Sequence, residues 1–292
     1  MDILSEITDH KRIEVELQKQ AVSPEQLREQ VRDLMENSPA PRRSMKHALA
    51  SSPAGIIAEF KRRSPSKGWI YETAKANEIP AAYEAAGASA ISILTDEKFF
   101  GGSLRDIRTA RPLVDIPILR KDFIIDEYQL LQARIAGADA VLLIAACLTQ
   151  EECADLTARA HALGLEVLLE IHSPRELAYI SKDVDMVGVN NRNLGTFVTD
   201  VENSFRIAGQ LRQTIADARN IPDAQGSSDT PRNLPLLVSE SGISHPETIC
   251  RLRTAGFRGF LIGETFMKTP QPGDALKGFI QGIEETEAQK SL

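Results

Sequence analysis

The sequence of 292 residues has little cysteine and no long apolar run, and both shortages narrow the classes of protein it can belong to. It has three cysteines, an odd number without a Cys-x-x-Cys pair, which argues against a disulfide framework or a cysteine zinc site. No run approaches the ~20 apolar residues of a membrane span, and the first 20 residues lack the core of a signal peptide. We therefore expect a cytoplasmic protein with reduced thiols, no bound metal and no membrane contact.

Positive charge is also scarce, because 34 Lys and Arg residues face 41 Asp and Glu residues, for a formal net charge of −7. The basic clusters at Arg42–Arg43 and Lys61–Arg63 are short. The sequence therefore predicts no broad positively charged surface that could bind nucleic acid, and we expect no such partner. A composition of 42% hydrophobic and 26% charged residues is ordinary for a globular protein.

The first 50 residues predict a helical extension. Apolar residues such as Ile3 and Ile7 recur at helical spacing, and Ser23–Pro24 predicts a cap and the start of a second helix. From residue 51 on, short β-branched runs alternate with amphipathic stretches, which is typical of parallel strands with crossover helices.

Eight strands are expected in this second part. They are Gly55–Phe60, Ala90–Leu94, Ile116–Arg120, Ala140–Ile144, Glu166–Glu170, Met186–Val189, Leu236–Ser239 and Gly259–Ile262. The expected helices are Ile79–Ala86, Glu127–Ala136, Gln150–Leu163, Arg175–Ile180, Phe205–Ala218 and Pro246–Ala255. Residues Asp223–Asn233, rich in Gly, Ser, Asp and Pro, read as a surface insertion.

Eight such units favour a closed barrel over an open doubly wound sheet, which usually has fewer strands and a Gly-x-Gly-x-x-Gly turn after the first one. That turn is missing here. We therefore predict a single (β/α)8-barrel domain of the TIM type over residues 1–292, with 1–50 as the extension and 51–292 as the barrel.

Charged and polar residues close most of the predicted strands, at the barrel face where active sites lie. They are Glu59, Lys61, Lys121, Glu170, Asn190, Arg192, Glu240 and Glu264. Any one of them is as well explained by a salt bridge that plugs the barrel mouth, but two lysines and several glutamates at one opening are costly for stability alone. We expect such crowding to shift their pKa values toward neutrality, for acid and base work.

The last two strands carry a separate signal. Ser241–Gly242 and Gly263–Glu264 follow them directly, where barrels of this kind commonly bind phosphate. Tight turns that need glycine explain either loop alone, whereas both together favour a phosphorylated substrate.

Other residues near the strand ends have two interpretations. His172 is explained either as a catalytic imidazole or, more simply, by helix capping, and Cys147 by packing. The loop with Trp69 and the pair Phe99–Phe100 beside two glycines form either a mobile cover or ordinary packing.

Seven stretches, in register along the chain, resemble the indole-3-glycerol-phosphate synthase family. The longest is Ile56–Gly68, which reads Ile-Ile-Ala-Glu-Phe-Lys-Arg-Arg-Ser-Pro-Ser-Lys-Gly. The others are Leu94–Ser103, Leu119–Phe123, Val167–His172, Val187–Leu194, Val238–Ile243 and Phe260–Glu264. Each is moderately specific, and seven in order are very specific.

The resemblance implies ring closure, decarboxylation and dehydration of 1-(2-carboxyphenylamino)-1-deoxyribulose 5-phosphate, without metal or other cofactor. It implies Lys121 as the general acid, with Lys61, Glu59 and Glu170 sharing the later proton transfers in an undecided division. The substrate would contact Ser64, Phe99, Phe123, Asn190, Arg192 and Glu240, and its phosphate would contact Ser241, Gly242, Gly263 and the backbone N–H of Glu264. Glu264 stands where relatives often have a small hydroxyl residue, so only its N–H is assigned to phosphate.

Two rival functions remain. One is another phosphate-binding barrel, such as phosphoribosylanthranilate isomerase or the tryptophan synthase alpha subunit; an isomerase would pair a Cys with an Asp, whereas strand one here ends in Glu-x-Lys. The other is an inactive scaffold, which predicts loss of a proton-handling residue, and none is missing. We expect a monomer or weak homodimer.

Overall fold

The computed structural model describes residues 3–37, 43–193, 195–219 and 234–290. Eight parallel strands close into a barrel in the order β1-β10-β9-β8-β7-β6-β5-β4, which confirms the predicted fold. The strands are β1 (Ile56–Phe60), β4 (Ala90–Leu94), β5 (Ile118–Lys121), β6 (Ala140–Ile144), β7 (Glu166–Ile171), β8 (Met186–Asn190), β9 (Leu236–Glu240) and β10 (Gly259–Ile262). The third predicted strand starts later than expected because Pro117 has no N–H to donate to a neighbouring strand.

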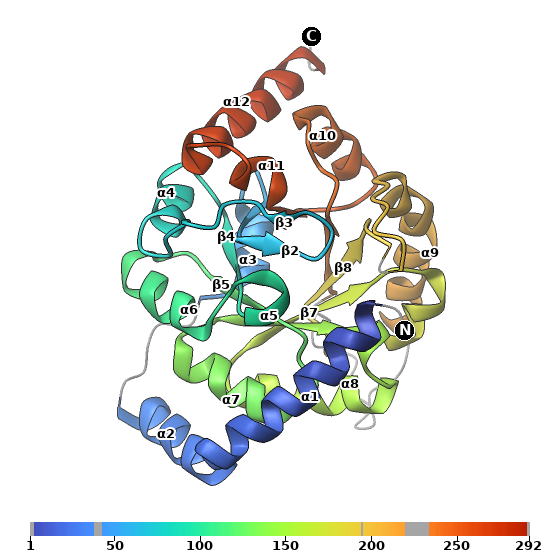
Figure 1. Ribbon diagram of the computed structural model, residues 1–292. Helices are drawn as coiled ribbons and strands as arrows, with labels where there is room; N and C mark the ends of the chain where they lie inside the picture. The colour runs from blue at the N-terminus through green and yellow to red at the C-terminus, as the bar shows by residue number, and fades with distance from the viewer. Residues whose placement is uncertain (1–2, 38–42, 194, 220–233, 291–292) are drawn as a thin grey trace.

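Helices cover the outside of the barrel (Figure 1). They are α4 (Ile79–Ala85), α5 (Glu97–Phe100), α6 (Leu104–Ala110), α7 (Glu127–Ala136), α8 (Gln150–Ala162), α9 (Glu202–Arg219), α10 (Pro246–Thr254), α11 (Glu264–Met267) and α12 (Pro272–Lys290), with short 3-10 turns η1 (Arg111–Leu113), η2 (Ala145–Cys147) and η3 (Pro174–Tyr179). The predicted helical stretch Arg175–Ile180 falls on η3, so it is a 3-10 helix and not an α-helix. The Tyr179 hydroxyl at its end donates to the Leu148 carbonyl at 2.7 Å.

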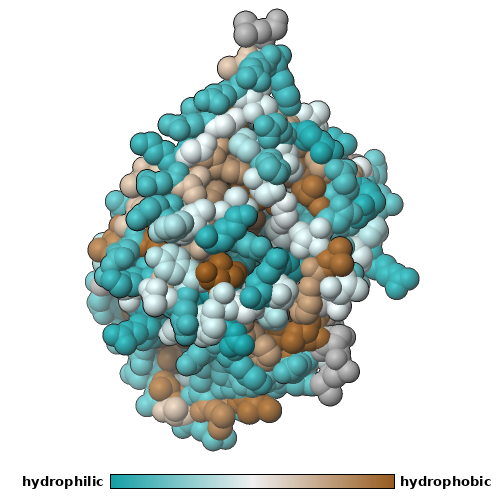
Figure 2. All heavy atoms as spheres, turned by 45° about the horizontal axis from the view of Figure 1, so that its top comes forward, coloured by the Kyte–Doolittle hydropathy of each residue, from teal (hydrophilic) through white to brown (hydrophobic). Residues whose placement is uncertain are grey.

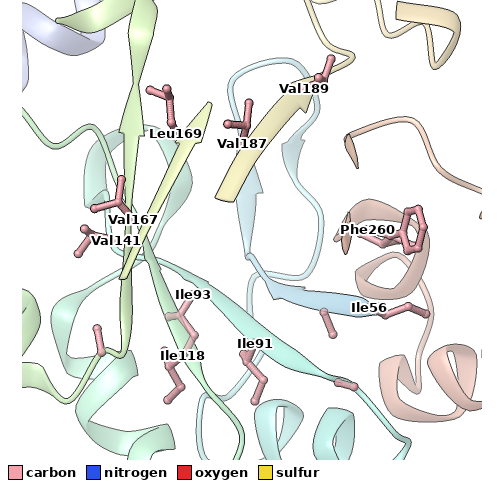
Figure 3. Packing of buried hydrophobic residues seen from close by; sticks show 14 of the residues in the cluster. Ile56, Ile91, Ile93, Ile118, Val141, Val167, Leu169, Val187, Val189 and Phe260 are labelled. Atoms are coloured by element: carbon pink, nitrogen blue, oxygen red, sulfur yellow. The ribbon is translucent and has the colours of Figure 1, made fainter. Parts of the chain in front are cut away.

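The strands are buried on both faces, as expected for parallel strands under crossover helices. Alternate side chains such as Ile91, Ile93 and Ile118 point outward and pack with the helices in one large cluster (Figure 3). Burial of each such side chain stabilises the fold by about 1.5–3 kcal/mol. The residues between them, such as Ser92 and Leu119, point into the barrel, so the same alternation supplies both the core and the cavity walls.

The N-terminal extension contacts the barrel at both ends. It consists of α1 (Ile3–Ala21), α2 (Pro24–Asn37) and α3 (Met45–Ser51), and the break between the first two falls at Ser23–Pro24 as predicted. The fully buried Met45 and Leu49 of α3 pack inside the barrel with residues such as Ile57. Helix α1 crosses the barrel beside α7 and α8 (Figure 1), and its first turns contribute to the cavity described below.

Hydrophilic residues cover most of the face seen in Figure 2, and hydrophobic residues form small separate patches on it. Within the described ranges, no helix has the length and apolar character that a membrane crossing needs. The predicted insertion Asp223–Asn233 lies outside the described residues.

Candidate active site

A cavity of about 610 Å³ opens at the carboxyl ends of the strands, where the strand-end residues were expected to meet. Twelve of the fourteen predicted site residues line it: Glu59, Lys61, Lys121, Phe123, Glu170, Asn190, Arg192, Glu240, Ser241, Gly242, Gly263 and Glu264. They come from six of the eight strands or from the turns that follow them. The closed barrel therefore brings together residues that are far apart in the sequence.

Lys121 is the central charge of this cavity. Its Nζ lies 2.6 Å from Oε2 of Glu170 and 3.0 Å from Oε2 of Glu240, so β5, β7 and β9 each supply one member of the group. The lysine side chain is 12% exposed and the two carboxylates are almost fully buried. An ammonium between two buried carboxylates is held in one position and is directed at the cavity.

The sequence led us to expect that crowding shifts the pKa values of these groups toward neutrality. Two of the pKa values shift in the other direction. Burial alone would lower the pKa of Lys121, but the carboxylates around it, led by Glu170 and Glu240, outweigh burial and raise that pKa. Burial would raise the pKa of Glu170, but Lys121 and then His172 lower it well below its usual range. The expectation is wrong for these two groups, because opposite charges stand closer to each than like charges do.

Glu240 behaves in the expected direction. Burial is the largest effect and raises its pKa to about 7; the nearby Lys121 opposes the rise and Glu170 adds to it. Its second oxygen, Oε1, has no hydrogen-bond partner among the described residues. This carboxyl group therefore changes charge near neutral pH and has a free acceptor.

Two glycines make room for the inward carboxylates. A Cβ on Gly188 in β8 would lie 2.0 Å from Oε1 of Glu240, and a Cβ on Gly263 would lie 2.3 Å from Oε1 of Glu59. Oε1 of Glu59 in turn contacts the ammonium of Lys61, two residues along β1 and on the same face. Gly188 was not predicted as a site residue, and its only sequence signal is a glycine inside an otherwise β-branched strand.

The expected turns after β9 and β10 also line the cavity. Ser241 and Gly242 follow β9 with φ values of 69° and 79°, in the left-handed region, and the Asn191 amide donates to the Ser241 carbonyl at 3.0 Å. Gly263 and Glu264 follow β10 and begin α11. Turns of this kind present backbone N–H groups to an anion.

Three further cationic side chains line the cavity: Lys67, Arg192 and Lys268. The Glu264 carboxylate lies 3.5 Å from Nζ of Lys67 and 3.4 Å from Nη2 of Arg192. Its negative charge therefore faces two cations of the cavity.

Ser64 and Phe99 are the two predicted site residues that the structure does not bring to the cavity wall. Ser64 is buried in the short strand β2 (Arg63–Ser64), which pairs with β3 (Gly68–Trp69), while the hairpin residues Ser66 and Lys67 face the cavity.

Phe99 is buried in α5 and packs edge-on against the His10 ring, at 5.7 Å between centroids. The carboxylate of Asp96 caps this helix at the Phe99 N–H. Of the two interpretations of this pair, Phe99 fits ordinary packing, and Phe100 is the ring that reaches the cavity.

An apolar part of the cavity wall comes from the N-terminal helix and was missed in the sequence. Ile3, Leu4 and Ile7 of α1 line the cavity together with Leu142 and Ile144 of β6. The helical spacing of Ile3 and Ile7 was visible, but nothing in the sequence indicated which part of the barrel this face would cover.

The chain matches the family model for indole-3-glycerol phosphate synthase over residues 4–221. The chain belongs to the indole-3-glycerol phosphate synthase family. An indole-3-glycerol phosphate synthase of Bacteroides thetaiotaomicron is 67% identical over 283 residues, which cover 97% of this chain and 99% of that protein. Proteins of the same name from Magnetococcus marinus (41% identical; 94% of this chain, 97% of that protein) and Rhodopirellula baltica (42%; 79% and 82%) are also similar.

Family membership agrees with the resemblance seen in the seven sequence stretches and excludes the isomerase and the alpha-subunit families as the chain's own. The match spans nearly the whole of the Bacteroides protein, N-terminal helices included. The family is one of carbon–carbon lyases, which act on a phosphorylated small molecule.

The position of His172 does not fit helix capping, the simpler of its two interpretations. Ser173, not His172, stands at the N-cap of η3, and it makes no side-chain capping bond. The His172 ring instead lies against Glu170, with Nε2 3.2 Å from Oε1.

Proposed function

We propose that the chain converts 1-(2-carboxyphenylamino)-1-deoxyribulose 5-phosphate to indole-3-glycerol phosphate, by ring closure, decarboxylation and dehydration. The observation that carries the proposal is the ammonium of Lys121 between Glu170 and Glu240, in a cavity that the turns after β9 and β10 also line. This cavity can hold a substrate with a phosphate at one end and an aryl ring at the other.

Lys121 acts as the general acid in this proposal. Closure of the five-membered ring needs a proton on the ketone oxygen while the aryl carbon attacks, and a charged ammonium directed at the cavity supplies that proton. The raised pKa of Lys121 keeps it protonated before each turnover. Glu170 and Glu240 fix its direction through the contacts at 2.6 and 3.0 Å.

Lys61, Glu59 and Glu170 carry out the later steps. Lys61 faces the same cavity and binds the substrate carboxylate until it leaves as carbon dioxide. Glu170 and Glu59 then serve as acid and base in the loss of water, because each is a buried carboxylate in contact with a lysine. Kinetics of single variants will decide which of the three groups acts in each step.

The remaining residues bind the parts of the substrate. Phe123, with Phe100 and the apolar face of α1, provides walls for the aryl ring, and Asn190 and Arg192 bind hydroxyl and carboxylate oxygens. The phosphate contacts the backbone of Ser241, Gly242, Gly263 and Glu264. We assign no contact to the Ser64 and Phe99 side chains, which do not line the cavity.

We further propose that the protein works in the cytoplasm as a monomer or weak homodimer. All three cysteines are free, which fits a reducing compartment. Sedimentation equilibrium across a range of protein concentrations tests the oligomeric state.

The activity is tested with purified protein and the carboxyphenylamino substrate, by the fluorescence of the indole product and by release of carbon dioxide. We expect the variant Lys121→Met to lose about 10³-fold in kcat, since general acid catalysis contributes about 10²–10⁴-fold. Lys75→Met is the matched control, because Lys75 is an exposed lysine that pairs with Glu78 outside the cavity. Absence of product with the unmodified protein, or full activity of Lys121→Met, would overturn the proposal.

A further inference from the structure

His172 links two carboxylates at the carboxyl end of β7. Its Nε2 lies 3.2 Å from Oε1 of Glu170, and its Nδ1 lies 3.7 Å from Oε2 of Glu176 in η3. The backbone fixes the second contact, because the His172 N–H also donates to Oε2 of Glu176 at 2.5 Å. Glu170 uses its other oxygen, Oε2, for Lys121, so the imidazole is the second cationic neighbour of this carboxylate.

A second cavity lies on the far side of His172. It has a volume of about 620 Å³ and is lined by residues that include His172, Glu176, Asp200, Asn203 and Arg206. Glu170 lines the first cavity and His172 lines the second, and Leu4, Asn190 and Arg192 line both. The contact between Glu170 and His172 therefore connects the linings of the two cavities.

The proposed reaction, on which this inference rests, consumes one proton in each turnover. The substrate carries an ionised carboxylate and releases it as neutral carbon dioxide, so that a proton must be taken up from solvent. Ring closure removes that proton from Lys121 and leaves a neutral amine. The Lys121 side chain is 12% exposed, and its exposed part faces the cavity that the substrate fills.

We propose that His172, held by Glu176, passes a proton from the second cavity to Glu170, which hands it to the neutral amine of Lys121. The Nε2–H bond of the imidazolium breaks as an O–H bond forms on Glu170. That O–H bond then breaks as the N–H bond of the Lys121 ammonium forms. Water or buffer in the second cavity returns a proton to the imidazole.

Small rotations are enough for these steps. The contact of His172 with Glu170 is ionic, and neither ring nitrogen forms a well-directed hydrogen bond with a described residue. Rotation of the imidazole about Cβ–Cγ, and of the carboxyl group about Cγ–Cδ, is broad and roughly two-fold. Rotation of the imidazole turns the ring nitrogen from the second cavity to Glu170 and back. Rotation of the carboxyl group turns its protonated oxygen toward Lys121.

The charges that face His172 favour this direction of transfer. Burial alone would lower its pKa, but Glu170 from β7 and Glu176 from η3 raise it to about 9, so the ring is charged at neutral pH. Asp200 and Arg206 line the same cavity as His172 and pair with each other at 2.9 Å. The pKa of Lys121 is raised as well, from a higher ordinary value, so the proton moves from the weaker base to the stronger.

The test is chemical rescue of the variant His172→Ala. In dilute buffer we expect kcat to fall about 100-fold, at the lower edge of the range for a missing proton-transfer group, with KM within about twofold of the unmodified protein. Added 4-methylimidazole should restore kcat in a saturable way, because a small base can enter the second cavity. His161→Ala is the matched control: His161 also pairs with a carboxylate, Asp185 at 2.8 Å, but it ends α8 at the amino side of β7.

Each other outcome decides against the relay. Unchanged kcat of His172→Ala at all buffer concentrations would overturn it, and so would a loss that imidazole does not restore, since that marks structural support of Glu170 alone. The variant His172→Gln fills the same space without carrying a proton, and should show the same loss if folding is intact. Failure of the unmodified protein to turn over would count against the proposed function instead.

Discussion

Two lysines of this chain are buried among carboxylates, and only one of the two clusters opens onto a cavity. Lys11 in α1 is fully buried, with Nζ 2.8 Å from Glu14, 2.9 Å from Asp96 and 3.0 Å from Asp122. Lys121 is the chain neighbour of Asp122, but it points into the barrel and lines the cavity. The two clusters have similar charges and lie side by side, so composition alone does not separate structure from function.

The difference lies in how far each cluster is exposed to the cavity. Besides Lys11, Asp122 accepts hydrogen bonds from Thr95 at 2.6 Å and from Arg120 at 2.9 Å. Each cluster has one buried carboxylate oxygen without a hydrogen-bond partner among the described residues, on Asp96 and on Glu240, but only Lys121 keeps an exposed part, which lines the cavity. The closed cluster fixes α1 to the barrel, whereas the open one presents its donors and acceptors to a substrate.

The largest effect on stability is expected from Lys11→Met. This variant leaves Asp96 and Asp122 buried without their lysine, and the loss of one partner of a buried ion pair costs about 3–5 kcal/mol. We expect the free energy of unfolding in urea to fall by that amount. Lys121→Met should lose less stability, because Glu240 can take up a proton near its raised pKa of about 7. An equal loss in both variants would remove the distinction between the clusters.

A smaller effect, on catalysis, is expected from Gly188→Ala. The added Cβ would lie 2.0 Å from Oε1 of Glu240, so this flexible carboxylate must move away from Lys121. A displacement of about 1 Å in an active site can cost about 100-fold in rate, and we expect a fall in kcat of that order. In the control Gly55→Ala, the Cβ meets the Arg258 backbone oxygen at 2.2 Å, so it should lower the melting temperature instead. Unchanged kcat in Gly188→Ala would show that the position of Glu240 is not critical.

The third prediction concerns the pH dependence of stability. It should distinguish the open cluster, because that cluster contains Glu240, a carboxyl group with a raised pKa. A carboxyl group whose pKa is raised on folding stabilises the protein below its ordinary pKa, and loses that contribution as the pH rises through the raised value. For Glu240 this loss runs from about pH 4.5 to about pH 7.

Glu240→Gln does not titrate, so its stability relative to the unmodified protein should increase by about 2–3 kcal/mol between pH 5 and pH 8. Urea unfolding at the two pH values measures this change. Glu247→Gln, at an exposed position of α10, is the control and should show no such trend. A constant difference for Glu240→Gln would mean that Glu240 stays ionised throughout.

Much of the fold could be predicted, because the signals that set it are local. Eight apolar runs, each buried on both faces, gave strands that overlap β1 and β4–β10, and Ser23–Pro24 marked a true helix boundary. The hairpin β2–β3 and the helix α5 were missed because two to four residues are too few for a period to be seen.

The site was predicted in part, since the ends of parallel strands meet at one face of a barrel. This rule alone predicts that Lys121, Glu170 and Glu240 lie close together. It could not show that α1 closes the wall, or that Gly188 makes room for a carboxylate, because both depend on contacts between distant segments. The pKa directions of Lys121 and Glu170 likewise depend on distances of a few ångströms.

A third and more exposed charge cluster should give the smallest effect. Glu264 stands between Lys67 and Arg192 at the phosphate end, at 3.5 and 3.4 Å, and all three side chains are at least 20% exposed. Exposed ion pairs contribute about 0.2–1 kcal/mol, far less than the buried clusters.

In Glu264→Gln the two cations become free for the substrate phosphate and one negative charge is removed from its surroundings. We therefore expect KM to fall about twofold to fivefold, as the free energy of an exposed pair allows, with kcat nearly unchanged. Steady-state kinetics at low and high salt measure the effect, which should shrink as salt screens the charges. Glu78→Gln, in the exposed pair with Lys75 outside the cavity, is the control. A higher KM in Glu264→Gln would mean instead that Glu264 holds Lys67 and Arg192 in the positions that bind phosphate.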